Sequence, residues 1–479
     1  MSHNVTRSQL VSRGQPWLPP MTEPARTGLF PLRLAAFEEY MFLDDRPDQP
    51  MTGVLAMRFR GTFDRPAFEA ALDDALRRNP LFWALVDARR RKPCWIAAPA
   101  GRPPLEWQPP HVPLDCPNAE ALDLRREPGF RMWIQQGGEQ ATLTFLGHHA
   151  VADAIGMTQF LGDVLAGYAV RRSSHLPPRA LPAPMPQRLG ERGLFRQSAP
   201  QPVSAWAATR FLAREAVKWF GRRALPLEAP RSAAAADEAD PFPGIHVHTF
   251  DVAQTNGLRD RAARQGGTLN DLLLRDLFVT MRAWNDQGGT AGGQRGNASG
   301  WLRIAMPTNL REPLDQYMPA ANKMSYAFLT RRPAACDDRG TLLAGLRAET
   351  AAIKHWRLSR TFVHGLETLL RVPGAMRWIL SGRRCLATAV LSNLGDPGWH
   401  FWTDFPRQDG LLTMGDVSLR EFIASPPLRA LTRACFLAVR YADRLTISLR
   451  CDRHLFRPAD ARRLLALYID QLGQTLAEP

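Results

Sequence analysis

Long hydrophobic runs are missing from this sequence of 479 residues. No stretch of eighteen or more apolar residues occurs, so the sequence predicts no membrane-spanning helix. Residues 1–26 are polar and contain proline, without the apolar segment of a secretory signal, so we expect a cytoplasmic protein. The six cysteines are scattered without CxxC spacing, which argues against both a disulfide framework and a zinc site.

Lysine is also scarce, since only four of the 61 basic residues are lysine and the rest are arginine. The formal net charge of +15 favours anionic partners such as nucleic acid, lipid headgroups or phosphorylated substrates. The basic residues are spread along the chain, however, and no recognisable nucleic-acid module is present. The charge therefore favours a phosphorylated substrate or a lipid surface over DNA or RNA.

The length of the chain and its mixture of strand-like and helix-like segments predict an α/β protein of two domains. Two blocks have a similar succession of strand-like and helix-like segments. They are separated by segments rich in Arg, Ser, Pro and Gln or in Ala and acidic residues. We therefore expect a flexible arm over residues 1–28 and a first domain over 29–185. A linker with a helix is expected over 186–244, and a second domain over 245–479.

Two adjacent histidines stand at the end of a β-prone segment, immediately before an amphipathic helix. His148 and His149 follow residues 141–146, and apolar residues at helical spacing run from Met157 to Tyr168. Connecting turns of this kind often present side chains at a cleft. A neutral imidazole is well suited to accept a proton near neutral pH, so the turn is a candidate general-base site.

Other interpretations of the pair stay open when only its spacing is considered. In one, the pair is structural, with one ring packed and the other solvated. A metal site is disfavoured because adjacent residues on an extended chain point to opposite faces, so the two rings would not bind one ion. A Ser-His-Asp hydrolase is disfavoured because no Gly-x-Ser-x-Gly sequence is present. Asp153 is expected to fix the turn by binding an arginine or backbone N–H groups.

The segment from His148 to Ala154 resembles the HHxxxDG signature of the CoA-dependent acyltransferase superfamily. Other segments resemble motifs of one branch, the bacterial wax ester synthase/diacylglycerol acyltransferases, and occur in the order expected there. They are Pro80–Trp83, Thr268–Asp271, Pro307–Arg311 with Ala321–Lys323, and Ser392–Pro397. The resemblance covers roughly residues 30–475, and its specificity comes from the order of the motifs rather than from any one of them.

The resemblance implies two chloramphenicol-acetyltransferase-like α/β sandwich domains with an active-site channel between them. His149 would be the general base that deprotonates an acceptor hydroxyl, His148 would be secondary, and Asp153 would hold the turn. Acyl-CoA would be the co-substrate and an alcohol or diacylglycerol the acceptor, without a metal or redox cofactor. A basic surface would suit peripheral contact with a membrane. A predicted helix over residues 203–225 either makes that contact or packs between the domains.

The other matched positions are supporting or structural candidates: Ala154, Gly156, Asn270, Asp271, Arg311, Ser392 and Asn393. Asp271 also fits the acid of a capping box opened by Thr268, which favours a structural role. Arg311 is either a surface arginine or the partner of an acid such as Asp153. Ser392 and Asn393 could equally end a strand in a turn.

Ala154 stands where the signature has glycine. A positive φ at this position would cost alanine about 1 kcal/mol, whereas a need only for a small residue would cost nothing. The departure keeps open a degenerate, non-catalytic lipid-binding member. A separate alternative is a condensation-type acyltransferase that takes the acyl group from a carrier protein.

Overall fold

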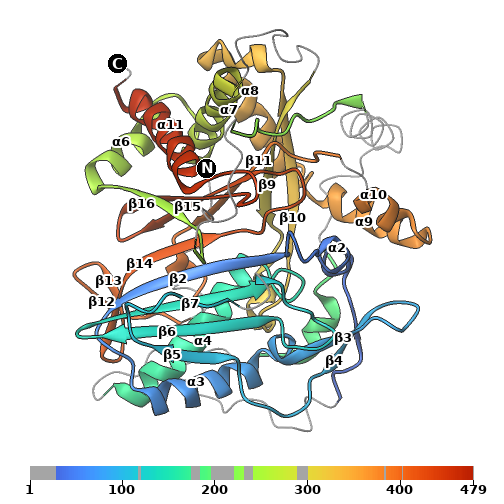
Figure 1. Ribbon diagram of the computed structural model, residues 1–479, viewed down its shortest axis with the longest axis vertical. Helices are drawn as coiled ribbons and strands as arrows, with labels where there is room; N and C mark the ends of the chain where they lie inside the picture. Colours follow the sequence, from blue (N-terminus) through green and yellow to red (C-terminus); the bar gives the residue numbers. More distant parts are fainter. Residues whose placement is uncertain are drawn as a thin grey trace.

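The computed structural model describes residues 28–116, 120–173, 184–195, 221–230, 241–288, 300–381, 384–401 and 403–477. Residues 1–27 of the predicted arm and residues 203–220 of the predicted linker helix lie outside this part of the chain. Two large sheets, each carrying helices, make up most of the described structure (Figure 1). The α/β class and the two sheet-rich domains expected from the sequence are thus confirmed.

The first sheet contains seven strands in the order β12-β13-β14-β2-β7-β6-β5. In that order they span Arg407–Gln408, Leu411–Met414, Val417–Ser425, Thr52–Arg60, Gln140–His148, Phe130–Gly137 and Leu105–Gln108. Helices α3 (Arg65–Arg78) and α4 (Ala154–Arg172) run together along one face of this sheet (Figure 1). Beside it lie helix α2 (Ala36–Asp44) and a small sheet of β1 (Leu32–Arg33), β4 (Cys94–Ala97) and β3 (Ala84–Asp87).

The second sheet contains six strands in the order β10-β9-β11-β15-β16-β8. In that order they span Met324–Arg331, Leu302–Asn309, Ala389–Gly395, Ala434–Tyr441, Arg444–Cys451 and His246–Phe250. The helices of this domain are α6 (Val252–Arg264), α7 (Leu269–Gly288), α8 (Arg339–His355) and α11 (Pro458–Ala477). Two further helices, α9 (Arg360–Arg371) and α10 (Ala375–Ser381), stand away from this group on the side of α2 (Figure 1).

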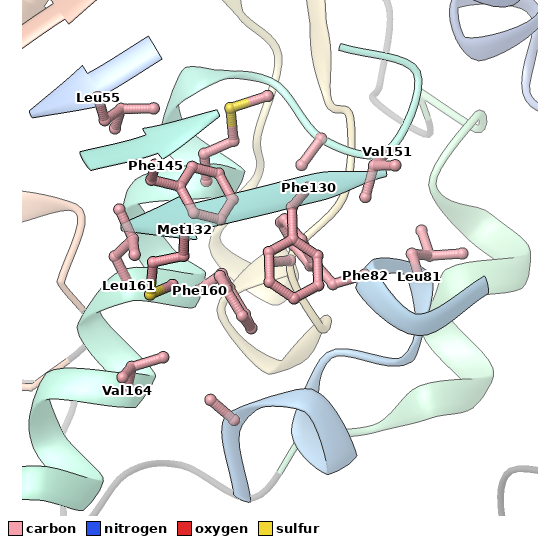
Figure 2. Close-up of a cluster of buried hydrophobic side chains, with 14 of the residues drawn as sticks. Leu55, Leu81, Phe82, Phe130, Met132, Phe145, Val151, Phe160, Leu161 and Val164 are labelled. Carbon is pink, nitrogen blue, oxygen red and sulfur yellow. The ribbon is translucent and has the colours of Figure 1, made fainter. Parts of the chain in front are cut away.

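A close-packed aromatic group fills the space between the first sheet and α4 (Figure 2). The rings of Phe82 and Phe160 are stacked with centroids 4.1 Å apart, and Phe130 stacks on Phe145 at 5.8 Å. Phe82 belongs to the short helix η2 (Pro80–Trp83) that follows α3. The motif at residues 80–83 therefore supplies core packing beneath the strand that ends at the histidines.

Strands β12, β13 and β14 come from the C-terminal half of the chain but complete the first sheet. β14 pairs antiparallel with β2, with Ser425 opposite Val54 at one end and Ser418 opposite Arg60 at the other. The predicted boundary at residue 245 remains a prediction, and the pairing adds that residues 407–425 belong to the sheet of the first domain. The C-terminal half of the chain consequently contributes three strands to the sheet of the first domain.

Candidate active site

His148 is the last residue of β7, which lies between β2 and β6 inside the first sheet, and His149 begins the turn that follows. The backbone N–H of His148 donates to the Gly129 carbonyl at 2.8 Å, and that of His149 donates to the Met51 carbonyl at 2.7 Å. The chain then turns, and α4 begins at Ala154. Because both neighbouring segments hydrogen-bond to the turn, the backbone that carries the two rings is fixed in place.

The His149 side chain lies almost completely inside the protein, with the residue only 5% exposed. Burial lowers the pKa of the imidazole from its ordinary 6.5 to about 4, against the opposing charge of Asp153. Its Nδ1 atom is sealed and has no hydrogen-bond partner among the described residues. The ring is therefore neutral at pH 7, which is the state that can accept a proton.

Glycine at position 53 of β2 makes room for this ring. A Cβ atom on Gly53 would lie 3.2 Å from His149 Nε2 and 3.2 Å from the carbonyl oxygen of Ser425 in β14. Contacts this short are tighter than most that a side chain makes, so only a residue without Cβ fits comfortably. Sequence reasoning missed Gly53, because nothing in the local pattern of β2 indicates that a histidine packs on it.

His148 is completely buried and its tautomer is set by its neighbours. Its Nδ1 atom accepts the backbone N–H of Ala150 at 3.0 Å, so the ring proton lies on Nε2 in the neutral form. That atom is 3.6 Å from Oδ1 of Asp45, which is longer than a hydrogen bond. Burial alone would raise the pKa of the Asp45 carboxyl, but His148 and the Met51 N–H lower it overall. His148 is thus held in one orientation behind the turn.

Asp153 caps α4 and accepts four hydrogen bonds. Its carboxylate receives the backbone N–H groups of Gly156 and Lys323 and two N–H groups of Arg311, all at 2.8 Å. Burial would raise the pKa of this carboxyl, but Arg311 and the backbone donors lower it below its usual value. The structure therefore places Asp153 where the sequence predicted a turn-holding acid, and makes Arg311 its partner rather than a surface residue.

Arg311 belongs to the connection between β9 and β10, residues 310–323, which reaches from the second domain onto the histidine turn. Asn322 of this connection donates through its side-chain amide to the carbonyls of both His149 and Ala150. The Ala320 N–H also donates to the Asn79 side chain at 2.8 Å. The sequence identified Asn322 only as part of a motif. Its hydrogen bond to the His149 carbonyl is seen only in the structure.

Alanine at position 154 causes no backbone strain. Ala154 is the first residue of α4, and its φ is not positive. The tight position is Gly156, where a Cβ atom would lie 2.7 Å from the carbonyl oxygen of Ala321 and 3.0 Å from Ala152 Cβ. The requirement for glycine in this turn thus lies two residues after the signature position, where the β9–β10 connection crosses the helix.

The residues of two other matched motifs, Thr268–Asp271 and Ser392–Pro397, form a separate group. Asp271 accepts the backbone N–H of Thr268 at 2.8 Å and the Thr350 hydroxyl at 2.7 Å, so it stabilises the start of α7. Asn270 accepts a hydrogen bond from the Asn393 amide at 3.3 Å. No hydrogen bond or ion pair within the described part of the chain joins this group to His149.

Ser392 and Asn393 do not form a turn at the end of their strand, as one interpretation of the sequence expected. Both lie inside β11, which pairs in parallel with β15 as far as Gly395. The register shifts between Asn393 and Gly395, where Gly395 has a φ of +69°. The break in the ladder therefore comes after the asparagine, because only glycine adopts that backbone conformation readily.

The described residues include no group of three His, Cys, Asp or Glu side chains placed to hold a metal ion. Within the same residues, no helix combines the length and the apolarity needed to cross a membrane.

Fold comparison places the chain in a defined structural class. No protein-family model matches the sequence, and a search of curated proteins found no match. Solved structures match along almost the whole chain, and they include condensation domains and an acetyltransferase. The protein therefore has the two-domain α/β fold that these proteins share.

Three solved structures illustrate the likeness. SgcC5 from Streptomyces globisporus is 18% identical with a TM-score of 0.63, covering 93% of this chain and 99% of its own. The starter condensation domain of rhizomide synthetase, in complex with C8-CoA and Leu-SNAC, is 13% identical with a TM-score of 0.61, covering 95% and 96%. The trichothecene 15-O-acetyltransferase of Fusarium sporotrichioides is 11% identical with a TM-score of 0.65, covering 96% and 100%. At these identities the comparison establishes the fold.

Proposed function

We propose that this protein is an acyltransferase that uses His149 as a general base to pass an acyl group from a thioester to a hydroxyl. The observation that carries the proposal is the His149 environment. A neutral, buried imidazole stands at a strand end, and backbone hydrogen bonds and Asn322 hold its main chain. Two of the structural neighbours are an acetyltransferase and a condensation domain solved with an acyl-CoA, which supports the same class of reaction.

In the proposed reaction, His149 removes the proton of the acceptor hydroxyl as its oxygen attacks the thioester carbonyl carbon. The tetrahedral oxyanion then collapses, the C–S bond breaks, and the imidazolium returns the proton to the departing thiolate. Nδ1 is sealed, which leaves Nε2 as the atom that accepts the proton. Asp153, neutralised by Arg311, holds the turn rather than taking part in the proton transfer.

For the donor we propose acyl-CoA, and for the acceptor a long-chain alcohol or diacylglycerol. The motif resemblance to wax ester synthase/diacylglycerol acyltransferases supports this choice, as does a net charge of +15, which suits the phosphates of CoA. Acyl-CoA and the acceptor would enter a channel between the two domains from opposite mouths. The condensation-domain neighbours favour a second candidate, in which a carrier protein supplies the acyl group.

A screen of donors against acceptors tests the proposal. Free thiol release would be followed with acyl-CoA or acyl-carrier protein as donor, and with long-chain alcohol, diacylglycerol or amine as acceptor. We expect thiol release with acyl-CoA and a hydroxyl acceptor, and a loss of about 10²- to 10⁴-fold in His149→Ala. Full turnover in His149→Ala would refute the general base. Ligand binding without product from any donor would identify a non-catalytic member.

A further inference from the structure

Helices α9 and α10 form a small unit outside the two sheets. They lie beside α2 and project from the side of the molecule (Figure 1). Residues 372–374 join them, and all three are exposed. The unit is held by a few apolar side chains that point inward, among them Val363 and Leu366 of α9 and Met376 and Leu380 of α10. Its remaining surface faces away from the core.

Large apolar side chains gather on that outer surface. Trp378 of α10 is 76% exposed, and Val372, between the two helices, is 57% exposed. The described chain has eight exposed large hydrophobic residues, and two of them, Val372 and Trp378, are only six positions apart. Exposed single apolar residues need no explanation, but a concentration of them indicates a contact surface.

The same surface is strongly basic. Arg371 and Arg377, next to Val372 and Trp378 in the sequence, are its exposed cationic side chains. Among the described residues from 354 to 384, the only acidic side chain is Glu367, which lies 3.3 Å from the His364 ring. We call Arg371, Val372, Arg377 and Trp378 the α9–α10 surface. Its charge is almost entirely of one sign.

We propose that the α9–α10 surface docks the protein on an anionic lipid membrane. Arginine and lysine side chains attract the phosphates of anionic headgroups. Tryptophan prefers the interfacial level of a bilayer, where its ring is partly apolar and its N–H remains hydrated. The exposed Val372 at the tip between the helices supplies an apolar group to insert. An acidic protein partner would match the charge, but Trp378 and the apolar tip favour lipid.

The proposal is independent of the catalytic one, although the two fit together. Helix α2, on which α9 and α10 rest, ends directly before Asp45, and Asp45 faces the His148 ring. Docking on this side would bring a lipid surface to the helix whose C-terminal neighbour, Asp45, lies beside the His148 ring. A membrane-bound acceptor would then approach the protein on the side of α2, next to the end of β7.

Vesicle sedimentation with the full chain tests the docking surface. Phosphatidylcholine vesicles with and without phosphatidylglycerol would be compared at low and high salt. We expect binding only to the anionic vesicles, and a loss at high salt because screening weakens charge attraction. Trp378→Ala and the double change Arg371→Glu with Arg377→Glu should each weaken binding about tenfold or more.

Matched variants elsewhere on the surface serve as controls. Trp399 is 59% exposed and Arg462 is exposed on α11, so Trp399→Ala and Arg462→Glu should bind vesicles as the unchanged protein does. Far-ultraviolet circular dichroism and thermal melting would establish that every variant is folded. Binding that ignores lipid charge, or that survives the α9–α10 changes, would overturn the proposal. Retention on an acidic carrier protein with no binding to vesicles would overturn it as well.

Discussion

At the scale of single residues, burial of His149 has the largest chemical consequence. The unperturbed pKa of histidine is about 6.5, and removal from water lowers the pKa of this ring to about 4 because the charged form loses hydration. The nearby Asp153 carboxylate opposes this shift but is itself neutralised by Arg311. The imidazole is therefore uncharged over the whole physiological range.

We predict that the acid limb of kcat/KM falls near pH 4 rather than near the ordinary histidine value of about 6.5. The direction follows because the base is active when neutral, and a lowered pKa keeps it neutral in more acidic solution. The measurement is a pH–rate profile with acyl-CoA well below its KM. A limb at about 6.5 would mean that the ring is solvated in the working enzyme.

The same pKa shift affects stability with a defined sign. The unfolded chain binds the His149 proton at about 6.5 and the folded chain only near 4, so stability is lost as the pH falls between these values. The loss amounts to about 3 kcal/mol at most. Urea unfolding at several pH values measures it, and His149→Phe should flatten that part of the curve. An unchanged slope in the variant would assign the pH dependence to other groups.

Glycine is needed at position 156 and not at position 154. We expect Gly156→Ala to lower the free energy of unfolding by about 1–3 kcal/mol, since its methyl group would meet the Ala321 backbone. Ala154→Gly, the change that restores the signature, should alter stability by about 1 kcal/mol or less and leave kcat within a few-fold. Urea unfolding and steady-state rates measure both. A large gain of activity in Ala154→Gly would contradict the assignment.

At the scale of elements, the β9–β10 connection ties the second domain to the histidine turn of the first. Arg311 contacts both carboxylate oxygens of Asp153, and the side chains are only 11% and 3% exposed. Breaking a buried pair on one side leaves an uncompensated charge, which costs more than the pair itself contributes. The connection is thus a strong determinant of where His149 sits.

Removing Arg311 should be far more damaging than removing a comparable exposed arginine. We predict that Arg311→Ala lowers the free energy of unfolding by about 3–5 kcal/mol and that Asp153→Asn in the same chain recovers part of the loss. Arg58→Ala is the matched control, because its pair with Glu421 is exposed and should contribute under about 1 kcal/mol. Additive effects of the Arg311 and Asp153 changes would refute the coupling.

The elements around the histidines were predictable because their signals are local. Asp64 caps α3 through the Ala67 N–H, and Asn79 ends this helix before a proline. The strand, the turn and the amphipathic pattern from Met157 likewise lie within one continuous stretch. The hold of Asn322 on the turn was not predictable in the same way, because 173 residues separate it from His149.

At the scale of the whole molecule, the sheet of the first domain is complete only with a strand, β14, from the C-terminal half of the chain. β14 covers the edge of β2, and its Leu419 and Phe422 belong to the core of the first domain. This strand was not among those predicted from the sequence, and its pairing with residues more than 350 positions earlier leaves no local trace. For this reason the two-domain α/β class could be predicted from the sequence, whereas the addition of β14 to the first sheet could not.

We predict that both domains unfold in one transition. Leu419→Ala in β14 and Leu391→Ala in the second sheet should each lower the same calorimetric melting temperature, by the equivalent of about 2–5 kcal/mol, because both side chains are buried. An exposed change on the second domain, Arg462→Ala, should leave the temperature within error. Two resolved transitions, each sensitive to only one of the leucine changes, would show that the domains unfold separately.

The late position of β14 also has a consequence for synthesis on the ribosome. β2 and β7 emerge early, but the free edge of β2 has no partner until Ser425 has left the exit tunnel. An uncovered strand edge can pair with another chain, so this edge is open to intermolecular pairing throughout that interval. The sheet that carries the histidines is therefore completed only when most of the chain has been translated.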